Sequence, residues 1–154
     1  MYRRILVPHD GSPFAERVLP HVIELAGPLQ AEIHLLEVIP SPNPAVYSAD
    51  LEAGAGVAVE AIDEAQEELR AQGSARLQEI ARELADRGIR AVWTVANGDP
   101  AREIIKYESA NDIDLVAMAT HGRTGLTRAL LGSVTDAVLR DGGRPVLVVR
   151  AKES

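Results

Sequence analysis

Short runs of apolar residues alternate along the chain with longer segments in which apolar positions recur every three or four residues. Continuous apolar runs are typical of strands that are buried on both faces, and the longer period is typical of helices. The predicted strands are 3–10, 31–39, 91–96, 114–119 and 144–149. The predicted helices between them are 12–27, 60–87, 99–109 and 133–140. This regular alternation predicts an α/β domain whose strands pair in parallel.

Capping and turn-forming residues mark the ends of these helices. Ser12 is the predicted N-cap of the first helix, and Gly27 is predicted to end it. Asp99 has the same position before the third helix as Ser12 has before the first, and Gly88 is predicted to stop the second. Pro20 falls inside the first helix and predicts a bend there, because proline has no backbone N–H.

The order of the elements predicts how the sheet is wound. Crossovers between parallel strands are almost always right-handed, which makes an open, doubly wound α/β sheet the expected architecture. A length of 154 residues fits one domain over 1–154, with no second domain and no strong internal repeat. In such a sheet a ligand binds beyond the carboxyl ends of the strands where the strand order reverses, here between the first and fourth strands.

Residues 40–60 do not fit this pattern, because prolines crowd the start of the segment and two glycines follow. A structureless connection of this length is unusual in a compact domain. The segment is therefore predicted to be a long mobile loop, with three roles open: a lid, a loop that contacts a partner, or a disordered surface loop.

Composition and charge exclude several classes of function. The chain is 46% hydrophobic and 25% charged, with a net charge of −7, which disfavours a broad basic surface for nucleic acid or for an anionic membrane. It has no cysteine, so disulfides, thiolate catalysis and cysteine metal ligands are excluded. No apolar run approaches the roughly 20 residues that span a bilayer, nor the pattern of a signal peptide. We expect a cytoplasmic protein.

Glycine and hydroxyl residues crowd the segment 118–135, directly after the fourth strand. Gly122 and Gly125 can adopt positive φ and turn backbone N–H groups inward. Gly132 and Ser133 stand where the last helix begins, and free N–H groups at a helix start favour phosphate. Thr135, Arg123 and Arg128 add a hydroxyl and positive charge. The alternative is a capping box made by Ser133 and Asp136, which needs no ligand.

Asp10 follows the first strand and so faces the same predicted crevice. Its carboxylate either accepts hydrogen bonds from a ribose or base, or caps the next helix or braces the turn with Gly11. His9 and His121 flank the crevice, but the sequence gives neither a carboxylate nor a serine partner for a triad. The other two histidines have no metal-ligand spacing, so no protein metal site is predicted.

The segments "RRILVPHDGS", "ANGDPAREII", "DLVAMATHGRTG", "LLGSVTDAVL" and "RPVLVV" together resemble the universal stress protein family over essentially the whole chain. The ATP-binding branch of that family carries the motif G-x2-G-x9-G-S/T. Gly122, Gly132 and Ser133 match it, whereas alanine stands at position 119 in place of the first glycine. The resemblance implies a five-stranded parallel sheet of order 3-2-1-4-5 in three α/β/α layers, of the Rossmann-like, adenine nucleotide alpha hydrolase-like type.

The resemblance also implies a ligand and a partner. Asp10 would contact the nucleoside, backbone near Val38 would read the adenine edge, and Gly132 and Ser133 would hold phosphates. The full predicted site comprises Pro8, His9, Asp10, Val38, Met118, Ala119, Thr120, His121, Gly122, Arg123, Gly132, Ser133, Val134 and Thr135. Mg²⁺ or Mn²⁺ would bind through the phosphates of ATP, ADP or AMP and not through protein side chains. A homodimer would form through the last strand, 145–150.

Three functions remain open from the sequence. The first is a regulatory stress-response switch that binds an adenine nucleotide. The second is slow ATP hydrolysis in the same crevice, for which only His9, His121 and Arg123 are available. The third is a dimeric interaction module that binds no nucleotide, as in another branch of the family.

Overall fold

A computed structural model describes residues 1–54, 56–122 and 131–152. Its five strands form one all-parallel sheet in the order β3-β2-β1-β4-β5, which confirms the predicted order. The strands are β1 (Arg4–His9), β2 (Glu32–Ile39), β3 (Ala91–Asn97), β4 (Leu115–Gly122) and β5 (Val146–Lys152). The helices are the 3-10 turn η1 (Ala15–Val18), α1 (Leu19–Leu29), α2 (Pro44–Ala53), α3 (Val57–Asp86), α4 (Pro100–Ala110) and α5 (Ser133–Asp141).

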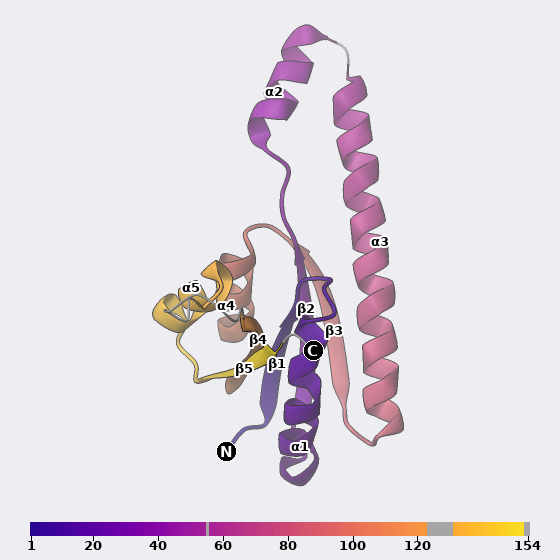
Figure 1. Cartoon of the computed structure of the whole chain (residues 1–154). Coiled ribbons are helices and arrows are strands. Elements are labelled where there is room, and N and C mark those ends of the chain that lie inside the picture. Colours follow the sequence, from indigo (N-terminus) through magenta and orange to yellow (C-terminus); the bar gives the residue numbers. More distant parts are fainter. Residues whose placement is uncertain (55, 123–130, 153–154) are drawn as a thin grey trace.

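Helices cover both faces of the sheet, with α1 and α3 on one side and α4 and α5 on the other (Figure 1). Side chains alternate along β1, so Ile5 and Val7 pack with Val22 of α1, whereas Leu6 packs with Ile104 of α4. All of these side chains are buried. The two cores make the three α/β/α layers that the sequence predicts.

The first helix differs from the prediction at both ends. Ser12 does not cap it, because α1 begins at Leu19 after a 3-10 turn. Pro20 therefore lies in the first turn of α1, where a missing N–H breaks no helical hydrogen bond and the expected bend has no cause. The helix also continues past Gly27, and Gln30 adopts the left-handed conformation that ends it, with φ 52°.

The segment 40–60 is not a structureless loop. Helix α2 occupies 44–53, and α3 already begins at Val57. The prolines mislead because one of them starts a helix: Asn43 is the N-cap, and its side chain accepts a hydrogen bond from the Ala45 N–H at 3.0 Å. Figure 1 shows α2 beside the first half of α3, beyond the end of the sheet. Tyr47 ties them together by donating to Asp63 at 3.1 Å.

Other helix ends agree with the sequence. The Asp99 side chain accepts from the backbone N–H of Arg102 at 3.0 Å, which confirms it as the N-cap of α4. Gly88 follows α3 with φ +74°, the left-handed conformation that stops a helix. Gly88 precedes β3 and Asp99 follows it, so these two residues bound that strand at its start and at its end.

Candidate functional site

A pocket of about 310 Å³ lies at the carboxyl ends of β1, β2 and β4. This is the place where the strand order reverses and where open α/β sheets bind ligands. The lining comprises Pro8, His9, Asp10, Ser12, Phe14, Ala15, Leu36, Val38, Pro40, Pro100, Ile104, Met118, Ala119, Thr120, Gly132, Ser133, Val134 and Thr135. Three connections of the chain therefore meet at one cavity.

The pocket brings together all of the predicted site residues except His121, Gly122 and Arg123. His121 and Gly122 end β4, but the His121 side chain is outside the described part. Arg123, Gly125 and Arg128 also lie outside the described residues. Contact of the pocket residues with a nucleotide stays a prediction.

Some lining residues were missed by the sequence analysis. Leu36 and Pro40 stand two positions before and after Val38, and alternate residues of a strand share a face. Pro100 and Ile104 are one helical turn apart at the start of α4. The spacing of two along the strand and of four along the helix was the signal that could have found them.

The two ends of the pocket differ in chemistry. Leu36, Val38, Ile104 and Met118 make an apolar wall from strands and α4. The start of α5 adds Gly132 and the hydroxyl residues Ser133 and Thr135 to the lining. A ligand with a flat apolar part and an anionic tail matches this division.

The polar side is formed by the amino end of α5. Gly132 is the N-cap, and among the described residues no side-chain hydrogen bond caps the first turn. The capping box is therefore wrong, because Ser133 is already the first helical residue and Asp136 pairs with Arg140 at 2.9 Å. The early N–H groups of this helix have no intrahelical acceptor, and the helix dipole adds partial positive charge. This end of the pocket favours an anion.

Asp10 lies where β1 ends and braces the following turn. Its Oδ1 atom accepts hydrogen bonds from the Ser12 backbone N–H at 2.9 Å and from Ser12 Oγ at 2.5 Å. Burial raises the pKa of Asp10, but the hydrogen bonds from Ser12 and the nearby His9 outweigh it and lower the pKa below its ordinary 3.8. Asp10 is thus a carboxylate at neutral pH, and its Oδ1 atom braces the turn.

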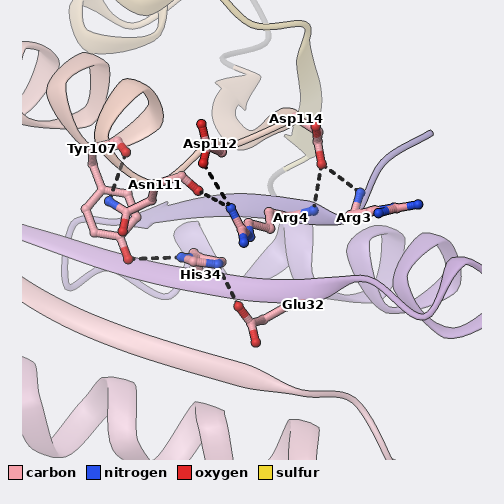
Figure 2. A network of polar contacts seen from close by, with 8 residues as sticks. All are labelled: Arg3, Arg4, Glu32, His34, Tyr107, Asn111, Asp112 and Asp114. Carbon is pink, nitrogen blue, oxygen red and sulfur yellow. Dashed lines mark hydrogen bonds and ion pairs between the residues drawn. The ribbon is translucent and has the colours of Figure 1, made fainter.

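His34 belongs to a different network, at the start of β2, and not to the pocket (Figure 2). Its Nδ1 lies 3.0 Å from Tyr107 Oη, and its Nε2 lies 3.0 Å from Glu32 Oε1. Asp114 in the same view accepts from the backbone N–H groups of Arg3 and Arg4 at 2.8 and 3.0 Å. These contacts join the first strands to α4 and the start of β4, so they are structural.

No group of three or more histidine, aspartate or glutamate side chains suited to a metal occurs among the described residues. Within the same part of the chain, no helix is long and apolar enough to cross a membrane.

The sequence model of the universal stress protein family matches residues 1–150. The chain belongs to this family. Among its relatives, universal stress protein MJ0577 of Methanocaldococcus jannaschii is 35% identical, over all of this chain and 98% of its own length. Universal stress protein YxiE of Bacillus subtilis is 31% identical, over 97% of this chain and all of its own length.

Solved structures of universal stress proteins have the same architecture. The structure of MJ0577 superposes with a TM-score of 0.79 and 32% identity, over all of this chain and 99% of that one. An Arabidopsis thaliana family member with AMP bound has a TM-score of 0.65 at 17% identity, over 96% of this chain and 91% of that one. A family member in complex with cAMP has a TM-score of 0.59 at 19% identity, over 97% of each chain. At identities of 17% and 19%, these last two matches show a shared fold and nothing more.

Proposed function

We propose that this universal stress protein binds an adenine nucleotide in the pocket between β1 and β4 and acts as a regulatory, stress-responsive switch. The observation that carries the proposal is the uncapped amino end of α5 on the polar side of a largely apolar pocket. Relatives with AMP and with cAMP bound support the choice of an adenine nucleotide. Its cytoplasmic location stays a prediction from the sequence.

The proposed binding mode follows the two ends of the pocket. The adenine packs on the apolar wall near Val38 and Met118, and Asp10 accepts from the ribose. The phosphates take the free N–H groups at Ser133 and Val134. Mg²⁺ or Mn²⁺ neutralises the phosphates of ATP, since the described protein residues offer no cluster of metal donors.

Pro40 connects the pocket to helix α3. Pro40 lines the pocket, and its backbone oxygen accepts from Gln66 Nε2 of α3 at 3.3 Å. The Gln66 side chain accepts in turn from Asn97 Nδ2 at 3.0 Å, at the end of β3. A nucleotide that moves Pro40 therefore acts on α3, and we keep residues 40–60 as the candidate segment whose hydrogen exchange slows when ATP binds.

The outer edge of β5 supports a homodimer through 145–150. Within the described part of the chain β5 pairs only with β4, so its other edge carries backbone N–H and C=O groups that a second copy can pair. Leu147 and Val149 are only partly buried. Light scattering after chromatography tests this proposal: the wild type elutes as a dimer and Val148→Pro as a monomer, whereas a wild-type monomer contradicts it.

Calorimetric titration with ATP and magnesium tests the nucleotide site. An added Cβ at Gly132 meets no atom of the described residues within 4 Å, so Gly132→Val is expected to fold and to block the phosphates. Its affinity should fall at least about tenfold, the cost of one or two lost charge-assisted hydrogen bonds. Gly27→Val is the matched control, because the Gly27 Cβ position is also open and lies on α1. Absence of wild-type binding to ATP, ADP and AMP refutes the proposal.

A further inference from the structure

The His9 side chain lies just before the turn that carries Asp10, and the nucleotide site as proposed gives this ring no role. His9 is the last residue of β1, and only 1% of its side chain is exposed. Its Nδ1 atom accepts a hydrogen bond from the Gly11 backbone N–H at 2.9 Å. Gly11 has φ +84°, a left-handed conformation that a side chain disfavours. The ring therefore holds the turn in a conformation that needs support.

This hydrogen bond defines the protonation state of the ring. A nitrogen that accepts from a backbone N–H carries no proton, so the neutral ring has its proton on Nε2. Nε2 is buried and has no hydrogen-bond partner among the described residues. The neutral Nε2–H tautomer is thus the form that fits this structure.

Charged groups surround the ring on several sides. Glu16 of η1 places Oε1 3.6 Å from Nε2, and Glu37 of β2 places Oε2 3.9 Å from Nδ1. Arg76 of α3 donates to both oxygens of Glu37, at 2.6 and 2.7 Å. Asp10 is the next residue of the chain. A proton added at Nδ1 would therefore have a carboxylate partner nearby, and the Gly11 N–H would lose its acceptor.

We propose that His9 is a positioning residue of the nucleotide site, which it serves only while its Nδ1 is unprotonated. The neutral ring fixes Gly11, and Gly11 fixes the turn in which Asp10 and Ser12 meet. Protonation replaces an acceptor with a second donor that faces the Gly11 N–H, and the turn is released. Nucleotide affinity consequently falls in acid. This inference rests on the proposed function, because it concerns the same pocket.

Two substitutions separate positioning from mere packing. Asparagine places Oδ1 at the same number of bonds from the backbone as His9 Nδ1, so His9→Asn keeps an acceptor for Gly11 that does not titrate near neutral pH. His9→Leu removes the acceptor. His21 is exposed on α1, which makes His21→Leu the matched control for loss of a histidine.

The experiment measures the affinity of the four proteins for ATP with magnesium at pH 8 and at pH 5.5. At pH 8, His9→Leu should bind about fivefold to tenfold more weakly than the wild type, and His9→Asn within about twofold of it. The ratio of the wild-type affinity to the His9→Asn affinity should fall about fivefold between pH 8 and pH 5.5. Titration of ATP itself affects both proteins alike and therefore cancels in this ratio. His21→Leu should follow the wild type.

If this affinity ratio does not change between pH 8 and pH 5.5, the inference is overturned, even where His9→Leu fails to fold. The inference is also overturned if His9→Leu folds and binds ATP as tightly as the wild type at pH 8. If the wild type binds no nucleotide at either pH, the proposed function fails. The role of His9 is then decided by amide hydrogen exchange of Gly11 in the free protein: faster exchange in His9→Leu than in His9→Asn supports it, and equal exchange refutes it.

Discussion

The ion pair between Glu37 and Arg76 offers the sharpest stability prediction, because the two residues join the sheet to α3. Only 10% of the Glu37 side chain and 29% of the Arg76 side chain are exposed. The close packing leaves little room for water: a Cβ at Gly73 would lie 3.2 Å from the Glu37 Cδ atom. Arg76→Met removes the charge and keeps most of the volume, so it leaves a buried carboxylate without its cation.

The expected cost follows from that burial. Breaking a buried ion pair by removing one partner costs about 3–5 kcal/mol. The partial exposure of Arg76 places this variant near the lower value, about 3 kcal/mol. For a chain of this length that loss lowers the melting temperature by about 6–12 °C. The double variant Glu37→Gln/Arg76→Met should recover roughly half of the loss, since the unpaired charge is gone.

Urea unfolding measures this effect through a lower midpoint at an unchanged slope. Arg82→Met is the matched control on the same helix, because its pair with Glu79 is about two-thirds exposed on both sides, at 66% and 63%. Exposed pairs contribute little, so this control should stay within about 0.5 kcal/mol of the wild type. If Arg76→Met is no less stable than Arg82→Met, Glu37 is hydrated and the reasoning from burial is wrong.

Three further predictions concern stability away from the pocket. Burial lowers the pKa of His34 below 6.5, although Glu32 opposes this shift. The wild type therefore loses stability as the pH falls below about 6.5. His34→Gln should flatten this dependence of stability on pH, as measured by urea unfolding at several pH values. Hydrogen bonds from the Arg3 and Arg4 N–H groups lower the pKa of Asp114. Asp114→Asn should therefore lower the free energy of unfolding by about 1 kcal/mol at pH 7. This difference should shrink below pH 3.8, where the wild-type carboxylate becomes protonated. Gly142→Ala should cost about 1–3 kcal/mol by thermal melting, because the new Cβ would lie 2.5 Å from the Val138 oxygen; an unchanged melting temperature would contradict it.

The sheet was predictable because its determinants are local. Apolar runs mark buried strands, and the Asp99 cap and Gly88 turn mark helix ends with short-range chemistry. The errors came where two local signals compete. Pro44 is typical of a break in secondary structure but here follows the cap Asn43, and Ser12 is typical of a helix cap but here bonds to Asp10.

The candidate site was predictable in part for a different reason. The position of the crevice follows from topology, so Asp10, which follows β1, and Ser133, which follows β4, could be placed together. The contacts of His9 could not, because Glu37 and Arg76 come from distant segments. No periodicity along a single sequence indicates which charged residues of a helix and a strand meet in the fold.

A crystal structure grown with millimolar ATP and magnesium decides whether the pocket binds a nucleotide. We expect a nucleotide in the pocket, with its phosphates on the N–H groups of Ser133 and Val134 and its ribose beside Asp10. A pocket that contains only water at that concentration, or a nucleotide bound elsewhere with Asp10 turned away, refutes nucleotide binding at this site.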